Sequence, residues 1–198
     1  YTEVDTLSLH DALPICADSL RLLRAAKRRG LPVTADVSIQ HLLLDESALE
    51  GFNSHCHVIP PLRSAADREA LLEAVADGTI DAICSQHTPI GSSSKAAPFP
   101  ATKPGMAGLD TLLGLVLQLV DDGKLALPRA LDAVTAAPAR CLGILAGQLE
   151  TGRPASLCVL DASAEKDYAE HWLSAGNNSP WRRDRKSTRL NSSHLLIS

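Results

Sequence analysis

A short apolar segment that runs directly into a polar cluster constrains this chain more than any other feature. Residues 81–85, DAICS, have the length and apolar character of a buried strand in a parallel sheet, and Gly78 precedes them. The polar cluster 86–89, QHTP, follows at once. In an α/β barrel, residues just past the C-terminal end of a strand face the active site. The segment therefore predicts an α/β fold and places any chemistry at this strand end.

A second strand and an intervening helix complete a strand–helix–strand unit. Residues 32–38, PVTADVS, are β-branched and short, as expected of a barrel strand. In the segment 64–77, Ser64 is an N-cap candidate, Asp67 completes a capping-box-like pair and Gly78 follows as a stop. Further helices are expected at 17–29, 109–122 and about 128–136, and a flexible loop at 91–95.

Composition and charge exclude several classes of protein. The chain has 198 residues and a formal net charge of -4, which gives no reason to expect nucleic acid or an anionic membrane as a partner. No apolar run approaches the roughly 20 residues that span a bilayer, and we expect no signal peptide. Five widely spaced cysteines without a C-x-x-C motif favour a reducing compartment. We therefore expect a cytoplasmic protein with neither a disulfide framework nor a structural zinc site.

The two ends of the chain differ in character from the rest. Residues 1–15 fit no element that follows, and residues 182–198 are abruptly basic and rich in Ser and Asn. Both resemble translated sequencing adapter, so we expect them to be non-native. The alternative for the second is a disordered basic tail that binds an acidic partner. Between them we expect a partial barrel at 16–145 and a return to a small β-element, with a C-terminal tail, at 146–181.

Several motifs resemble the dihydroorotase family of the amidohydrolase superfamily, in that family's order and spacing. Residues 83–90, ICSQHTPI, resemble its I-A-T-D-H-A-P-H, and residues 30–44 resemble G-L-P-V-T-A-E-V-x-x-H-H-L-L-L. Residues 58–64 resemble V-N-P-P-L-R-S, and residues 174–181 resemble S-x-G-K-N-T-P-F. The resemblance covers about 17–181. It implies the C-terminal part of a TIM-type (β/α)8 barrel, with two of its eight strands, plus part of the small accompanying β-sandwich.

Three departures fall where the resemblance places chemistry. Gln86 stands where the family has an Asp that ligates the metal and acts as general base. Ile90 replaces a substrate-contacting His, and Ile59 replaces a substrate-contacting Asn. An amide ligates a dication weakly and hardly accepts a proton. We therefore expect no catalytic residue here, and the resemblance leaves only Gly105, in a glycine-rich turn, as a candidate backbone contact to substrate.

A short His-Cys-His sequence offers metal ligands at another place. If residues 55–57 formed a strand, His55 and His57 would share one face, as a metal site requires. The superfamily's own H-x-H lies far upstream of the part seen here. We therefore expect the pair to be structural, with metal ligation as the alternative, and we expect His41 to anchor its loop by a hydrogen bond.

The resemblance implies a place in de novo pyrimidine biosynthesis and leaves more than one function open. It is closest to the catalytically degenerate dihydroorotase-like subunits that accompany bacterial aspartate transcarbamoylase. A member of this kind would be non-catalytic, would hold no cofactor and would bind the transcarbamoylase catalytic subunit as an assembly partner. The alternative is an active dihydroorotase or other cyclic amidohydrolase, which hydrolyses a cyclic amide C–N bond with zinc. The third is an unrelated binding role, or a fragment without a function of its own.

Overall fold

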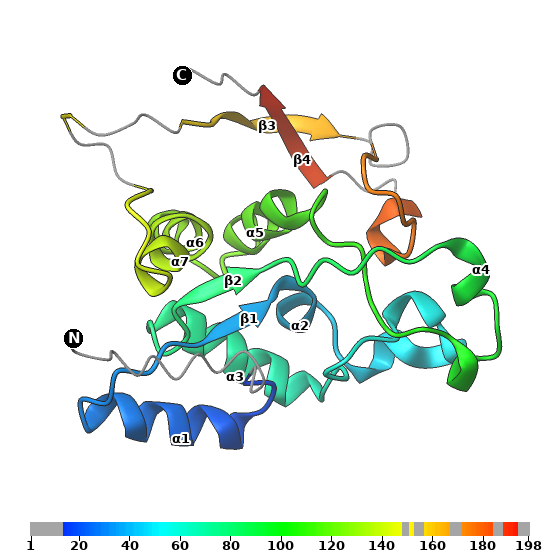
Figure 1. Ribbon diagram of the computed structural model, residues 1–198, viewed down its shortest axis with the longest axis horizontal. Helices are drawn as coiled ribbons and strands as arrows, with labels where there is room; N and C mark the ends of the chain where they lie inside the picture. The colour runs from blue at the N-terminus through cyan, green and yellow to red at the C-terminus, as the bar shows by residue number, and fades with distance from the viewer. Residues whose placement is uncertain (1–13, 148–150, 153–156, 167–171, 184–187, 194–198) are drawn as a thin grey trace.

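A two-stranded parallel sheet organises the chain in the computed structural model, which describes residues 14–147, 151–152, 157–166, 172–183 and 188–193. Its strands are β1 (Asp36–Ser38) and β2 (Ala82–Cys84), and α3 (Ala65–Ala76) connects them (Figure 1). This is the predicted strand–helix–strand unit. Both strands are shorter than the sequence suggests.

Helices cover the sheet on both sides. In Figure 1, α1 (Ala17–Arg28) and α3 lie below the sheet. The helices α5 (Leu112–Asp121), α6 (Leu127–Val134) and α7 (Ala136–Cys141) lie above it. None of the helices in the described ranges is long and apolar enough to cross a membrane.

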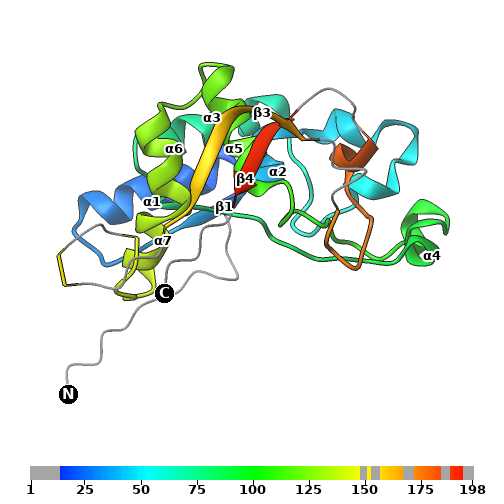
Figure 2. The ribbon, with the colours of Figure 1, turned by 90° about the horizontal axis from the view of Figure 1, so that it is seen from above.

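Shorter helical segments gather beyond the C-terminal ends of the strands. Figure 2 shows α4 (Ser92–Lys95) and the segment around residue 180 at the end of the molecule away from α7. These turns shape the loops that surround the strand ends. They are α2 (Ile39–Leu43), α4 (Ser92–Lys95) and the 3-10 turns η1 (Glu46–Phe52), η2 (Ser54–Cys56), η3 (Phe99–Ala101) and η4 (Pro180–Arg183).

The main hydrophobic core lies between the sheet and its helices. Val37 and Ile83, opposite each other in the register, are 1% and 3% exposed. Burying an aliphatic side chain of this size stabilises the fold by about 1.5–3 kcal/mol. With aromatic residues at only 3% of the sequence, the core is aliphatic. Its other buried members include Leu20, Ile39, Leu71, Val75, Leu115 and Leu119.

The start and end of α3 follow the local signals in the sequence. Ser64 is the N-cap, and its Oγ accepts a hydrogen bond from the backbone N–H of Asp67 at 3.2 Å. Gly78 follows the helix with a φ of +78°, a conformation that glycine adopts without strain.

The helix α5 starts three residues later than the apolar periodicity predicts. Leu109 is 61% exposed rather than buried, and its backbone N–H donates to His87 Nδ1 at 3.1 Å. The Asp110 carboxylate accepts from the backbone N–H of Leu173 at 2.9 Å. These residues make tertiary contacts instead of the first helical turn, so the predicted start at 109 is wrong.

The C-terminal part forms a second, antiparallel sheet from β3 (Val159–Lys166) and β4 (Thr188–Ser193). The strand β3 lies within the range predicted for a small β-element. The strand β4 lies within 182–198, whose non-native origin stays a prediction, as do the predicted domain boundaries. Residues 1–13 lie outside the described part of the chain.

Candidate functional site

Gln40 and Gln86 meet at the C-terminal ends of the two strands. Gln40 lies in α2, which begins directly after β1, and the residue is 1% exposed. Gln86 follows β2 with a φ of +43°, which is uncommon outside glycine. Gln40 Nε2 donates to Gln86 Oε1 at 2.6 Å. A neutral amide pair thus occupies the place where the sequence locates any chemistry.

Gln86 makes a second hydrogen bond, to the loop before α3. Its Nε2 donates to the carbonyl oxygen of Ile59 at 3.0 Å, and the Ile59 residue is 67% exposed. We call the Gln40 amide, the Gln86 amide and the Ile59 carbonyl the amide relay. At its other end, buried Gln40 Oε1 has no hydrogen-bond partner among the described residues.

His41 fixes the neighbouring part of the same loop. Its Nε2 is 3.1 Å from the carbonyl oxygen of Pro60, and its Nδ1 is 2.5 Å from Ser38 Oγ. Because a carbonyl oxygen only accepts, Nε2 carries the proton and Nδ1 accepts from the Ser38 hydroxyl. Burial lowers the pKa of His41, against the raising effect of the carbonyls of Pro60 and Pro61. His41 is therefore a neutral anchor of this loop, as the sequence predicts.

Asn178 holds the loop after β2 and the glycine-rich turn together. It is fully buried, its Oδ1 accepts from the backbone N–H of Ile90 at 2.7 Å, and its Nδ2 donates to the carbonyls of Thr88 and Gly105, each at 2.9 Å. The N–H of Gly105 donates to the carbonyl of His57 at 2.8 Å. Both backbone polar groups of Gly105, the candidate substrate contact, thus have partners within the chain. Sequence analysis missed Asn178, although it lies in the closing motif 174–181.

The His-Cys-His sequence is not a strand. His55 lies in the 3-10 turn η2, where about three residues per turn place positions i and i+2 on different sides. Thr102 Oγ1 donates to the carbonyl of Phe99 at 2.7 Å, so it accepts from His57 Nδ1 at 2.7 Å. The His57 ring also stacks on Phe99, with centroids 4.7 Å apart. The shared face that a metal pair needs is absent at this turn, and His57 packs the loop.

Lys95 is a buried cation in a segment that the sequence predicts to be a flexible loop. It ends α4, is 5% exposed, and its Nζ donates to the carbonyls of Ser54 at 2.8 Å and His57 at 3.2 Å. Burial lowers the pKa of Lys95, and together burial and the Lys95 charge lower the pKa of His57. A single Lys after three serines gave no sequence signal for this role.

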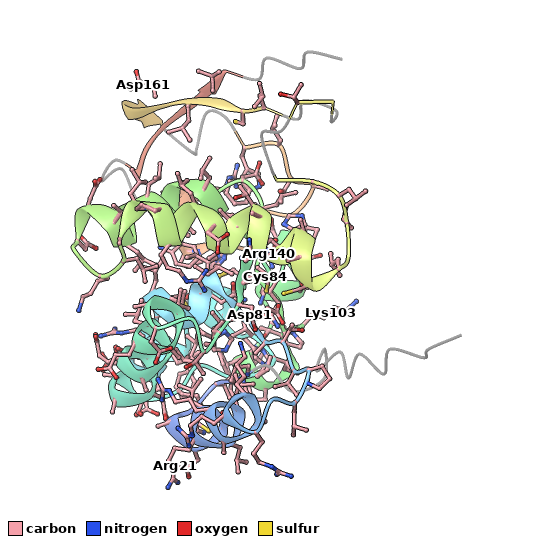
Figure 3. The ribbon with its side chains drawn as sticks, turned by 90° about the vertical axis from the view of Figure 1, so that its left-hand side faces the viewer. Arg21, Asp81, Cys84, Lys103, Arg140 and Asp161 are labelled. Carbon is pink, nitrogen blue, oxygen red and sulfur yellow. The ribbon has the colours of Figure 1, made fainter. Side chains whose placement is uncertain are left out.

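A cavity of about 390 Å³ lies at the opposite ends of the strands. Figure 3 labels two of its lining residues, Asp81 and Arg140. The charged side chains that line it already have partners: the Asp81 carboxylate accepts from Lys27 Nζ at 2.8 Å, and Arg140 makes two 3.0 Å bonds to Asp132. We therefore locate the candidate site at the amide relay rather than in this cavity. The cavity lining includes Thr34, Asp81, Arg129, Asp132, Arg140 and Cys141.

Comparison with known proteins identifies the family. The model described as "Amidohydrolase family" matches residues 5–187. The chain belongs to the amidohydrolase family. It is 46% identical over 165 residues to a dihydroorotase-like protein of Pseudomonas aeruginosa, a match that covers 83% of this chain and 39% of that protein. It is 43% identical over 192 residues to a dihydroorotase of Anaeromyxobacter dehalogenans, a match that covers 96% of this chain and 44% of that protein. The chain thus spans less than half the length of these relatives.

Solved amidohydrolase structures confirm the predicted α/β barrel fold. The L-hydantoinase (dihydropyrimidinase) from Arthrobacter aurescens matches with a TM-score of 0.74 at 27% identity, over 80% of this chain and 37% of the hydantoinase. The inactive dihydroorotase-like domain of the Chaetomium thermophilum CAD-like multifunctional protein matches with a TM-score of 0.50 at 26% identity, over 65% of this chain and 35% of that one. The predicted dihydroorotase resemblance is confirmed as well.

The donors at the strand ends of this amidohydrolase chain do not suit a metal ion. Burial, reinforced by the nearby Asp36 carboxylate, raises the pKa of Cys84 to about 12, so its thiol stays protonated. His87 Nδ1 is occupied by the N–H of Leu109. Within the ranges that the structure describes, no three His, Cys, Asp or Glu side chains gather as metal ligands would. These residues do not form a metal site by themselves.

Proposed function

We propose that this amidohydrolase chain is part of a non-catalytic dihydroorotase-like protein of de novo pyrimidine biosynthesis. In this proposal the protein acts in the cytoplasm as an assembly partner of aspartate transcarbamoylase. The observation that carries the proposal is Gln86, whose amide is hydrogen-bonded at both ends. A general base needs a pKa near the working pH, and the oxygen of an amide is far too weakly basic to accept a proton there.

The surroundings of Gln86 also support a non-catalytic role. Ile59 and Ile90 present aliphatic side chains where the family resemblance places an Asn and a His that contact substrate. The backbone of Gly105 bonds to Asn178 and His57. A substrate with several polar groups would therefore lose hydrogen bonds to water at this strand end without replacing them.

The alternative proposal is an active dihydroorotase or other cyclic amidohydrolase with zinc as its cofactor. It is favoured by the Anaeromyxobacter dehalogenans relative, which is called a dihydroorotase and matches 96% of this chain. More than half of that relative's length lies outside the match, so ligands from other barrel strands would have to build the metal site. Gln86 would then have to be tolerated in an active enzyme.

Co-expression of the complete protein with the aspartate transcarbamoylase of its host tests the partnership. We expect the two proteins to elute together in size-exclusion chromatography, and transcarbamoylase activity to depend on the complex. A transcarbamoylase that assembles and works equally well without this protein would contradict the proposal.

A hydrolase assay separates the two proposals. We expect the complete protein to open the dihydroorotate ring no faster than the buffer does. Turnover that disappears with a chelator and returns with zinc would instead support the active dihydroorotase.

A further inference from the structure

The amide relay fastens together three segments that are far apart in the sequence. Gln40 lies in α2, and Gln86 lies in the loop after β2, 46 residues further along the chain. Ile59 lies in the loop before α3 and precedes Gln86 by 27 residues. A metal ion can fasten strand ends in the same way, since its ligands come from several elements and its binding is coupled to folding. Here two hydrogen bonds between neutral groups join the segments.

The carbonyl of Ile59 fixes the direction of the relay. Since this oxygen only accepts, the Gln86 amide must present its Nε2 to it, and Gln86 Oε1 then faces Gln40. If both amides were rotated by half a turn, Gln86 Oε1 would lie against the Ile59 oxygen, with no hydrogen between two acceptors. The relay therefore has one arrangement that satisfies all of its bonded groups.

A carboxylate at position 86 cannot keep this arrangement. An ionised Glu would still accept from Gln40 Nε2, but it has no hydrogen for the Ile59 carbonyl. An Asp, which the family resemblance places here, lacks that hydrogen and is also one methylene shorter. Either residue would place a negative charge beside a carbonyl oxygen that now accepts a hydrogen bond.

We propose that the Gln40–Gln86–Ile59 amide relay is a structural cross-link that replaces the metal ion at these strand ends. The other donors described at these strand ends do not complete a zinc site, even when a carboxylate is restored at position 86. This inference rests on the non-catalytic part of the proposed function. It does not depend on the transcarbamoylase, so failure of the cross-link and failure of the partnership are seen in different experiments.

Gln86→Glu tests the cross-link, because it keeps the length of the side chain but replaces the NH₂ donor with a negatively charged acceptor. Gln118→Glu is the matched control, since Gln118 is exposed on α5. In urea unfolding of the full chain at pH 8, where the new carboxyl is ionised, we expect Gln86→Glu to raise the unfolding equilibrium constant about tenfold, because a hydrogen bond is lost and the new negative charge faces the Ile59 carbonyl oxygen. Gln118→Glu should change it less than about threefold. Equal effects of the two substitutions would overturn the cross-link.

Gln86→Asp tests whether a restored carboxylate rebuilds a zinc site with the donors that remain. We expect wild type, Gln86→Asp and Gln118→Glu to retain the same small amount of zinc after dialysis against it, and zinc to leave their thermal midpoints unchanged. One zinc per chain in Gln86→Asp alone, with a raised midpoint, would overturn the proposal.

Hydrogen exchange on the unaltered chain provides a measurement that needs no substitution at position 86. We expect the side-chain NH₂ protons of Gln40 and Gln86 to exchange much more slowly than those of Gln118 in NMR spectra, because both amides are hydrogen-bonded within the relay. If a Gln86 variant fails to fold, this measurement decides the matter. Slow exchange at both amides supports the relay, and exchange as fast as at Gln118 overturns it.

Discussion

Asn178 Oδ1 accepts a hydrogen bond from the backbone N–H of Ile90 at 2.7 Å, across 88 residues of sequence. The same side chain donates to the carbonyls of Thr88 and Gly105, so one buried amide satisfies three backbone groups. A buried backbone group that loses its partner costs more than an ordinary hydrogen bond contributes. The segment 174–181, which contains Asn178, therefore holds the loop after β2 in place.

Replacing Asn178 by Asp should strongly destabilise the fold. The carboxylate would face the carbonyls of Thr88 and Gly105 without a hydrogen to donate, and we expect a loss of about 2–4 kcal/mol in the free energy of unfolding. Asn177→Asp is the control, because Asn177 Oδ1 only accepts, from Ser92 Oγ at 3.0 Å, and a carboxylate keeps that bond. Urea denaturation measures both. Similar losses for the two variants would show that the three hydrogen bonds of Asn178 contribute no more than an ordinary surface contact.

A methyl group at Gly176 should push the segment 174–181 away from the backbone of Pro89 and Ile90. A Cβ there would lie 2.3 Å from the backbone nitrogen of Ile90, where no flexible side chain can yield. We expect Gly176→Ala to cost about 1–3 kcal/mol in the free energy of unfolding, as overpacking does. Gly91→Ala is the control, because Gly91 has a φ of -68° and no atom within 4 Å of such a Cβ. A thermal midpoint of Gly176→Ala that matches the control would contradict the close approach.

Acid should weaken the fold through His41. Burial lowers the pKa of His41 from its ordinary value of about 6.5, so between the two values the unfolded chain binds more protons than the folded one. This contribution to stability is complete above about pH 6.5 and is lost as the pH falls below it. We expect His41→Asn to be less stable than wild type at pH 8, with a difference that shrinks toward pH 5. Parallel curves for the two proteins would contradict this.

Thiol labelling should distinguish Cys84 from Cys158. The thiolate is the reactive form, and burial with the Asp36 carboxylate raises the pKa of Cys84 to about 12, whereas Cys158 is exposed. With an alkylating reagent at pH 8, mass spectrometry should find Cys158 modified well before Cys84 in the folded protein. In urea the two should react at similar rates. Equal rates in the folded protein would contradict the raised pKa of Cys84.

Local signals in the sequence predicted the elements that depend on local chemistry. The helix α3 has its cap at Ser64 and its stop at Gly78 because hydrogen bonding and glycine conformation act over a few residues. The start of α5 was predicted wrongly because Leu109 continues the apolar period, while contacts to His87 and Leu173 hold the adjoining backbone in another form.

The candidate site was predictable only in its location. The position of Gln86 after a strand indicated where to look, but no local rule pairs it with Gln40 or with the carbonyl of Ile59. Lys95 and Asn178 were missed for the same reason. Their partners are backbone atoms more than 35 residues away, and backbone atoms carry no sequence signature.

The bond between Asn178 and Ile90 also sets an order of events during synthesis. A ribosome adds about 5–20 residues per second, so Ile90 is made roughly 4–18 s before the side chain that holds it. In that interval the helix α3 and the parallel strand pair can form, because all of their residues have already been made. The loop after β2 lacks its hydrogen bonds to Asn178 until that residue is made, and during that time the loop is accessible to chaperones and proteases.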